Sequence, residues 1–290
     1  MSTIELPTGV MRAWPGAEGA NIRTWIGFKH FTYLVEAAVF AWFRDRGHGA
    51  AVLYHEHGVG LSIVGCSLLL PAVLDVDDEV SAEVIPVRPG RFTVRLRVDR
   101  GGPVTVCRAK VDVALVREPE APGDRPVPAE LADLVVDGVT GDVEPAPPGA
   151  FEWSWRAPYF YCQYSDRVAH SGYVRALEET VDRFLAARGI SVGRMLTERG
   201  WIPVVSRSSV TLLADARMEE TIYTSFRVTD VLRGVTYDAR MDCHVLRDGK
   251  PVHVATATIQ HGYAISRGPA AGQLAELDPP VLAALTGGTP

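Results

Sequence analysis

The amino-acid sequence predicts an α+β protein made of two similar halves, each a long helix wrapped by an antiparallel sheet. Two observations lead to this prediction: the sequence repeats itself along most of its length, and each half contains one helical stretch followed by four strand-like runs. If the two halves pair edge to edge, they form one continuous sheet that carries two long helices.

The repeat is clearest when residues 53–79 are placed over residues 195–221. Three identical residues then coincide: Glu56 with Glu198, Gly58 with Gly200, and Ala72 with Ala214. Upstream of these segments, the same spacing matches Gly47 with Gly189. After a shift of two residues, the sequence HFTY (30–33) also resembles HSGY (170–173). Features that recur in the same order at the same spacing indicate a duplicated domain.

Each half yields the same elements in the same order. Helices are expected at 31–45 and 173–188. Valine- and threonine-rich strands follow at 59–70, 80–87, 91–99 and 104–117, and again at 201–213, 221–232, 235–246 and 252–265. The glycine-containing segments 99–103 and 247–251 predict a hairpin in each half.

These elements divide the chain into five parts. They are an N-terminal extension (1–20), a first half (21–117), a proline-rich linker with a short helix near 128–135 (118–150), a second half (151–267) and a tail with a short helix (268–290). The linker has few large apolar residues, so we expect the two cores to lie in the two halves.

Composition excludes several classes of protein. The net charge is −6 and no block of basic residues occurs, which argues against a nucleic-acid surface. The sequence has no secretory signal and no apolar run long enough to cross a membrane, and its four cysteines form no CxxC pair. We therefore expect a cytoplasmic protein with reduced thiols. Phosphate-loop and dinucleotide patterns are absent and His55-Glu56-His57 lacks a third ligand, so no cofactor or metal is expected.

Glu36 is the one charged residue in the apolar helix 31–43. A helix that is apolar on nearly all sides is buried, and burying a carboxylate costs free energy unless it is paired or stays protonated with a raised pKa. Two interpretations follow: Glu36 is a general acid or base, or it is held by a structural hydrogen bond.

The sequence YSDRVAHSGYVRALEE (164–179) contains a second group of polar residues. Asp166 and His170 precede the helix, so their side chains can converge on its amide end, where free N–H groups stabilise an oxyanion. Alternatively, Asp166 or Ser171 caps the helix and His170 is a satisfied, half-buried residue. Glu178 lies at the edge of the helix's apolar stripe.

YSDRVAHSGYVRALEE resembles the aspartate-x-x-glycine-histidine turn that leads into the central helix of hotdog thioesterases, with Ala169 in place of the glycine. RPVPAELADLV (125–135) resembles a segment that follows the last strand in acyl-CoA thioesterases of this fold. The chain thus resembles a double hotdog protein of the thioesterase superfamily. The resemblance implies a catalytic aspartate at Asp166, the motif histidine at His170, and the helix-opening tyrosine at Tyr173.

In hotdog pairs, each site combines the turn of one half with the helix of the other. The resemblance therefore implies one catalytic site in which Asp166, His170 and Tyr173 face Glu36. The opposite site retains His30 and Tyr33 but has no aspartate before the histidine; together with Glu178, these residues are predicted to bind substrate.

The leading functional hypothesis is a thioesterase that hydrolyses an acyl thioester of CoA or of an acyl carrier protein. Many aromatic residues near the predicted site favour a bulky group, such as an aromatic or polyketide acyl chain. Two alternatives remain open: a dehydratase, hydratase or cyclase on a carrier-bound chain, and a non-catalytic acyl-binding protein. The expected partner is the acyl-CoA or acyl carrier protein thioester, with no nucleic acid and no membrane. The resemblance also allows further pairing into larger oligomers.

Overall fold

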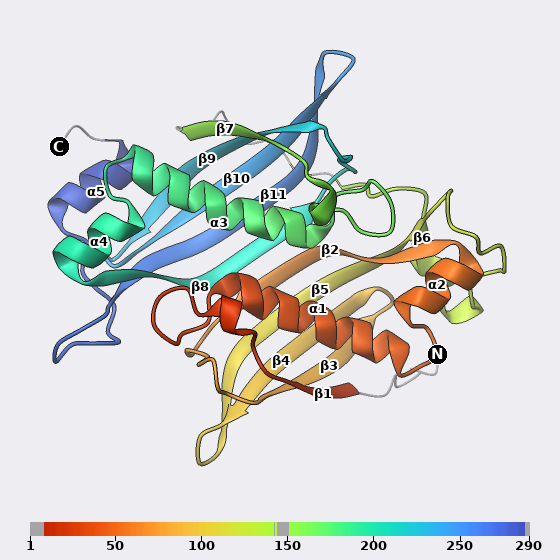
Figure 1. Cartoon of the computed structure of the whole chain (residues 1–290), viewed down its shortest axis with the longest axis horizontal. Helices are drawn as coiled ribbons and strands as arrows, with labels where there is room; N and C mark the ends of the chain where they lie inside the picture. Colours follow the sequence, from red (N-terminus) through yellow and green to blue (C-terminus); the bar gives the residue numbers. More distant parts are fainter. Residues whose placement is uncertain (1–8, 142, 144–150, 288–290) are drawn as a thin grey trace.

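The computed structural model describes residues 9–141, 143 and 151–287. Two long helices, α1 (Phe28–Arg44) and α3 (His170–Ala187), lie side by side over one large antiparallel sheet (Figure 1). The predicted α+β class and the single sheet carrying two long helices are both observed.

The sheet contains the strands of both halves in mirrored order, β1-β3-β4-β5-β2-β8-β11-β10-β9-β7. The first half supplies β1 (Gly9–Ala13), β2 (Val59–Leu69), β3 (Val80–Arg88), β4 (Arg91–Asp99) and β5 (Pro103–Arg117). The second half supplies β7 (Phe151–Arg156), β8 (Trp201–Leu212), β9 (Thr221–Leu232), β10 (Thr236–Arg247) and β11 (Lys250–Ile265). The short strand β6 (Val135–Val136) runs parallel to β5.

The two halves join where β2 pairs with β8. Their antiparallel register runs from Gly65 opposite Thr211 to Leu69 opposite Arg207. Beyond Gly65, the N-terminal part of β2 has no ladder partner in β8. This stretch still pairs with β5, and the second half's turn before α3 approaches it at Gly60.

Each long helix covers its own hydrophobic core. In the first half, Phe43 is fully buried and its ring contacts those of Trp42 and Phe92 edge-on. In the second half, the ring of Phe184 packs against that of Phe226, with centroids 5.1 Å apart. Two separate cores are the physical counterpart of the repeat in the sequence.

Shorter elements complete the fold. They are η1 (Ala17–Gly19), α2 (Ala50–His57), η2 (Ala129–Leu134), η3 (Tyr159–Tyr161), α4 (Val192–Arg199) and α5 (Pro279–Thr286). The short helices expected near 128–135 and in the tail correspond to η2 and α5. The carboxylate of Asp278 accepts a hydrogen bond from the Val281 N–H and fixes the start of α5.

Several details differ from the sequence prediction. Both long helices begin three residues earlier than predicted, after Gly27 and Ala169, because neither start carries a capping side chain that marks it in the sequence. The short strands β1 and β7 and the helices α2 and α4 were not predicted. In addition, α1 is not buried on all sides: Ala37 is exposed and Glu36 is half-buried.

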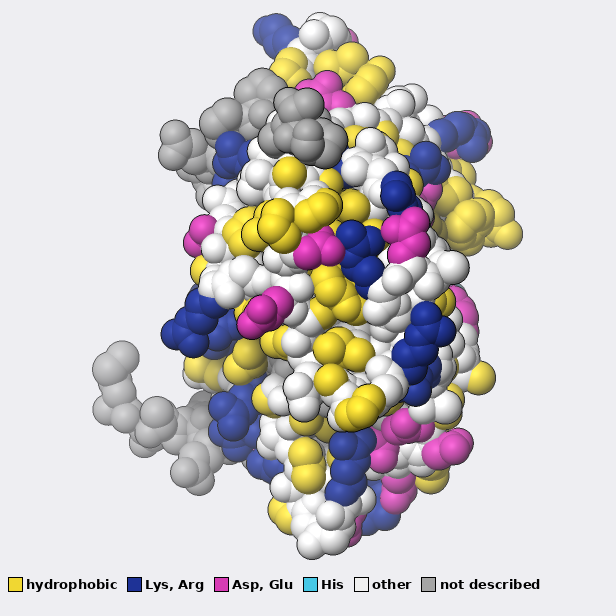
Figure 2. All heavy atoms as spheres, turned by 90° about the vertical axis from the view of Figure 1, so that its left-hand side faces the viewer, with side chains coloured by type: hydrophobic (Ala, Val, Ile, Leu, Met, Phe, Trp, Pro, Cys, Tyr) yellow, Lys and Arg dark blue, Asp and Glu magenta, His cyan; other side chains and the backbone are white. Residues whose placement is uncertain are grey.

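The surface carries charges of both signs. Figure 2, which views the left-hand side of Figure 1, shows Lys and Arg side chains interspersed with Asp and Glu. Among the described residues, no helix is long and apolar enough to span a membrane.

Replacing Phe43 by alanine tests the first core. The side chain has 0% exposure, so Phe43→Ala should lower the free energy of unfolding by about 3–5 kcal/mol, measured by chemical denaturation. The matched control is Phe160→Ala: this side chain is 60% exposed, and its loss should change the free energy by less than about 0.5 kcal/mol. Equal effects of the two substitutions would contradict the assigned core.

Candidate active site

Glu36 and Glu178 occupy equivalent positions in the two long helices. Each lies eight residues after the first residue of its helix, so the repeat places one carboxylate in the middle of α1 and the other in the middle of α3. The same superposition places Phe28, and not His30, on His170. The two-residue shift that matched HFTY with HSGY therefore does not hold in the structure.

The two halves meet around Glu178, and we call this contact the Glu178 junction. Its side chains are charged or polar and pair with one another. Lys29 Nζ lies 2.8 Å from Glu178 Oε2, and Asn21 Nδ2 donates a hydrogen bond of 3.5 Å to Glu178 Oε1. Arg175 Nε donates to the Tyr33 hydroxyl at 2.6 Å and so links α3 to α1. A hollow of about 310 Å³ lies beside these side chains. Tyr33 and Glu178 thus lie in one cluster, in which Glu178 is held as an ion pair with Lys29.

His30 lies close to this cluster but does not line the hollow. The side chain is buried, and its ring contacts that of Tyr33 edge-on at 5.3 Å. Burial lowers the pKa of His30, and its Nδ1 has no hydrogen-bond partner among the described residues. His30 is therefore neutral and packed behind the cluster, while Tyr33 and Glu178 form its polar part.

The junction around Glu36 differs in its chemistry. Glu36 makes no hydrogen bond or ion pair with any residue that the structure describes, and burial raises its pKa to about 7. Burial also raises the pKa of Tyr164 and Cys66, and the negative charge of Glu36 contributes to both shifts. Of the two equivalent glutamates, Glu36 is the one suited to exchange protons near neutral pH.

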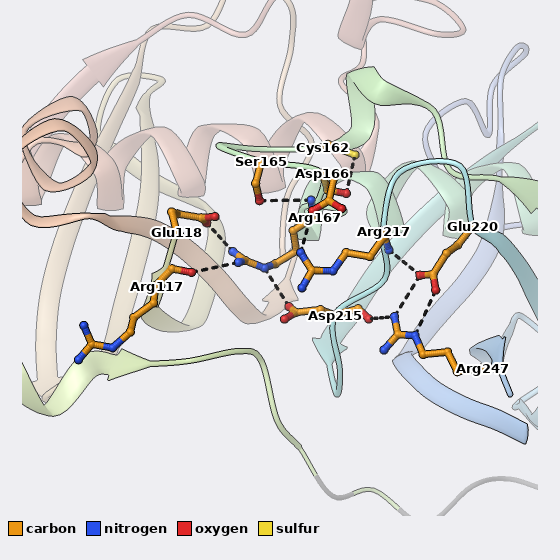
Figure 3. A network of polar contacts seen from close by, with 10 residues as sticks. All are labelled: Arg117, Glu118, Cys162, Ser165, Asp166, Arg167, Asp215, Arg217, Glu220 and Arg247. Carbon is orange, nitrogen blue, oxygen red and sulfur yellow. Dashed lines mark hydrogen bonds and ion pairs between the residues drawn. The ribbon is translucent and has the colours of Figure 1, made fainter. Parts of the chain in front are cut away.

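A buried arginine holds the second half's turn against the first half. Arg167 lies in the turn before α3, with Nη1 at 2.6 Å from Glu118 Oε1 and Nε at 3.1 Å from Asp215 Oδ1 (Figure 3). The three side chains are 7%, 1% and 12% exposed, respectively. Glu118 directly follows β5 of the first half and Asp215 follows β8 of the second. Arg167 therefore ties the turn to both halves.

Charged residues continue from this triad toward the surface. Arg247 donates a hydrogen bond to the Asp215 carbonyl oxygen at 2.5 Å and pairs with Glu220 at 3.1 Å. The Arg217 side chain contacts Asp166 at 2.7 Å (Figure 3). The Asp166 side chain is 52% exposed.

Asp166, His170 and Tyr173 do not converge on Glu36. The carboxylate of Asp166 points toward Arg217 at the surface, and no hydrogen bond or ion pair joins it to Glu36. Tyr173 is 1% exposed, within the second core, where its ring lies 6.3 Å from that of Trp155. The predicted meeting of these residues with Glu36 is thus not observed, because the turn directs Asp166 outward and the helix directs Tyr173 into the core.

His170 is a buried, neutral residue at the first position of α3. Burial lowers its pKa to about 4, and its Nε2 lies 3.2 Å from the Val210 carbonyl oxygen. Since a carbonyl only accepts, Nε2 carries the proton. No side chain caps α3 at Ala169, so the capping role considered for Asp166 or Ser171 is wrong. The cavity beside His170 measures about 10 Å³, the size of one water, and is too small for an acyl group.

Tyr164 is a site residue that the sequence did not identify. It has a left-handed backbone (φ 65°), which is uncommon for a tyrosine, and its ring stacks on that of Tyr54 at 6.0 Å. The ring packs onto Gly60 of β2, where an added Cβ atom would lie 2.7 Å from Tyr164 Cδ2. Gly60 could have indicated this contact in the sequence, because a glycine within a strand often marks a place where another part of the chain packs closely.

Comparisons with known proteins agree with this fold. Residues 161–285 match the family described as the Thioesterase-like superfamily. The acyl-ACP thioesterase from Bacteroides thetaiotaomicron superposes with a TM-score of 0.56 at 14% identity, over 88% of this chain and 97% of that chain. The 12:0-ACP thioesterase from Umbellularia californica superposes with a TM-score of 0.62 at 9% identity, over 88% and 97%.

No curated protein sequence matches the chain. The family match covers the second half, and the similar structures span both halves. The α+β hotdog fold and the resemblance to the thioesterase superfamily, predicted from the sequence, are confirmed.

Removing the Arg167 guanidinium tests its role in holding the junction. Arg167→Met leaves Glu118 and Asp215 buried without their partner and should lower the free energy of unfolding by about 3–5 kcal/mol. Arg217→Met, which removes an exposed pair, should cost at most about 1 kcal/mol. Chemical denaturation of both variants measures the difference, and a stable Arg167→Met protein would disprove the assignment.

Proposed function

We propose that the protein is a thioester hydrolase built from two tandem hotdog units, and that Glu36 is its catalytic carboxylate. The units would be residues 21–117 and 151–267, with 1–20 as an extension, 118–150 as the linker and 268–290 as the tail. The family match of the second half and the fold of the whole chain support the reaction class. The observation that carries the site assignment is a carboxylate without a partner, with its pKa raised to about 7, at the junction of the halves.

Glu36 would act as a general base toward a water molecule. The ionised carboxylate takes a proton from water, and the water oxygen forms a bond to the thioester carbonyl carbon. The tetrahedral intermediate then collapses with cleavage of the C–S bond, and the thiolate receives the proton from Glu36. A base with a pKa near the operating pH performs both transfers efficiently.

The substrate would be an acyl group carried by CoA or by an acyl carrier protein. The two similar structures are an acyl-ACP thioesterase and a 12:0-ACP thioesterase, which supports this class of substrate. Tyr33 and Phe40, both half-buried on α1, flank Glu36 in the sequence and favour contact with a bulky acyl group. A cytoplasmic location and further pairing into oligomers stay predictions.

The remaining predicted residues would have supporting roles. In the Glu178 junction, the hollow beside Arg175 and Glu178 is a place for a part of the substrate remote from the reacting carbon. His170 and Tyr173 would hold the start of α3, and Asp166 would hold the turn through Arg217. This assignment differs from the resemblance, which gives catalysis to Asp166.

Replacing Glu36 by glutamine tests the proposed base. We expect Glu36→Gln to lower kcat by about 10²–10⁴-fold, the usual contribution of general acid–base catalysis. Thiol release from a panel of aliphatic and aromatic acyl-CoAs, detected with DTNB, measures the effect. The control is Glu198→Gln, on the exposed face of α4, which should leave the rate unchanged. If Glu36→Gln kept full activity and Asp166→Asn lost it, the catalytic carboxylate would be Asp166 and not Glu36.

The raised pKa of Glu36 predicts two pH effects of opposite direction. Activity should rise with pH through about 7 as the base ionises. Stability should fall as pH rises from about 4.5 to about 7, because the folded state holds this proton more tightly than the unfolded state does. Comparing thermal unfolding of wild type and Glu36→Gln from pH 4 to 9 isolates the second effect, which should disappear in the variant. A pH-independent difference between the two proteins would contradict the raised pKa.

A further inference from the structure

The hollow in the Glu178 junction is lined by groups of both charges. It measures about 310 Å³, and its walls come from both long helices, which lie side by side (Figure 1). Small-molecule pockets start at roughly 300 Å³, so the hollow has room for a small ligand. The lining contains two cations, Lys29 and Arg175, and four carboxylates, which are Glu18, Glu178, Glu179 and Asp182. The ionised lining therefore has a net charge of −2.

Arg175 is held in place without an ionic partner. Its Nε donates to the Tyr33 hydroxyl at 2.6 Å, and its guanidinium carbon lies 5.5 Å from the centre of the Tyr33 ring. The same carbon lies 5.4 Å from the centre of the Tyr161 ring, which also lines the hollow. No other hydrogen bond and no ion pair joins Arg175 to a residue that the structure describes. Its two terminal nitrogens therefore keep their N–H donors for another partner, while the orientation of the group is already set.

Other arginines of this helical layer are used differently. Arg183, also on α3, donates from both Nε and Nη2 to Glu179, and Arg194 on α4 pairs with Glu198 at 2.8 Å. Arg175 lines a hollow with four carboxylates and forms an ion pair with none of them. Its bond to Tyr33 holds the guanidinium away from these neighbours, so its charge stays available to a ligand.

The carboxylates of the lining divide into two kinds. Two of them already have a cationic partner; these pairs are Lys29–Glu178 at 2.8 Å and Arg183–Glu179 at 2.7 Å. The other two, Glu18 and Asp182, make no hydrogen bond or ion pair with any described residue. The hollow thus presents one unpaired cation, Arg175, and two unpaired carboxylates.

These three groups define the chemistry of a matching ligand. A planar carboxylate fits the fork of a guanidinium, which can donate two parallel hydrogen bonds to it. An ammonium group donates hydrogen bonds to carboxylates and is attracted by their charge. A ligand with several negative charges is repelled by the net charge of the lining. A ligand that carries one carboxylate and one ammonium satisfies Arg175 and the free carboxylates together.

We propose that the hollow binds a zwitterion, with its carboxylate on Arg175 and its ammonium facing Glu18 and Asp182. This inference deepens the proposed function, on which it rests only for the link to the substrate, because binding in the hollow requires no reaction. The same chemistry belongs to a free amino acid and to an acyl group whose far end carries an amine and a carboxylate.

Titration calorimetry of the full chain tests the binding. The probes are glycine, β-alanine, 4-aminobutyrate and 5-aminopentanoate, in which the two charges lie progressively further apart. Butyrate and butylamine, each with a single charge, are the reference ligands. We expect at least one zwitterion to bind about tenfold or more tightly than both reference ligands.

Substitutions in the lining locate the binding. Arg175→Met should weaken the best zwitterion by about tenfold or more, because it removes the charged donors. Asp182→Asn, an exposed change, should weaken the same ligand by about threefold and leave butyrate bound at least as well. The matched control is Arg194→Met, which removes an exposed arginine outside the hollow and should leave the affinity unchanged. If Arg175→Met does not fold, Asp182→Asn still decides the outcome.

Three results would overturn the inference. They are no binding by any zwitterion, equal binding of butyrate and the best zwitterion, and binding that neither Arg175→Met nor Asp182→Asn weakens. Thiol release from ordinary acyl-CoAs tests the proposed function separately, and its absence would leave the calorimetry to decide this inference.

A comparison of two acyl-CoAs distinguishes the two sources of the zwitterion. The first carries an amine and a carboxylate at the far end of the acyl group, and the second ends in a methyl group. A KM for the first that is lower by about threefold or more, with the difference lost in Arg175→Met, assigns the zwitterion to the substrate. Equal KM values, together with binding of the free zwitterion, assign it to a separate small ligand.

Discussion

The position of the candidate site depends on one buried arginine. Arg167 is paired with Glu118 from the first half and with Asp215 from the second, and each of these charges requires its partner because burial removes it from water. This requirement fixes the turn before α3 relative to both parts of the sheet. Once the turn is fixed, the Tyr164 ring is held against Gly60 of β2. Pairing of β2 with β8 joins the two halves from Gly65 to Leu69. Where β2 no longer pairs with β8, Arg167 holds the turn before α3 against the first half.

The two halves of the protein form two equivalent junctions whose side chains differ. Glu178 has acquired Lys29 as a counter-ion and lies beside a hollow lined by charged groups. Glu36 has no counter-ion, and burial raises its pKa into the physiological range. The same backbone arrangement therefore supports an ion pair at one junction and a titratable carboxylate at the other. We interpret this difference as a difference in role: the Glu178 junction contacts the substrate, and Glu36 acts in the reaction.

The sequence predicted the architecture well and the site in part. Hydrophobic periodicity located both long helices and most strands, because those elements bury continuous apolar faces. Glu36 could be singled out because it is the one charge in an apolar helix. The direction of Asp166 could not be predicted, since it depends on Arg217, 51 residues later in the chain. Neither Gly27 nor Ala169 has a side chain that caps the following helix, so the helix starts could not be located in the sequence. The two helices were therefore aligned two residues away from their correct superposition.

The central claim is that Glu36 is the catalytic carboxylate. The most direct measurement is a crystal structure with an acyl-CoA analogue in which a methylene group replaces the thioester sulfur, so that the carbonyl remains but cannot be cleaved. The account predicts that the carbonyl carbon faces the Glu36 carboxylate. A carbonyl bound beside Asp166 and Arg217, or in the hollow beside Glu178, would contradict it.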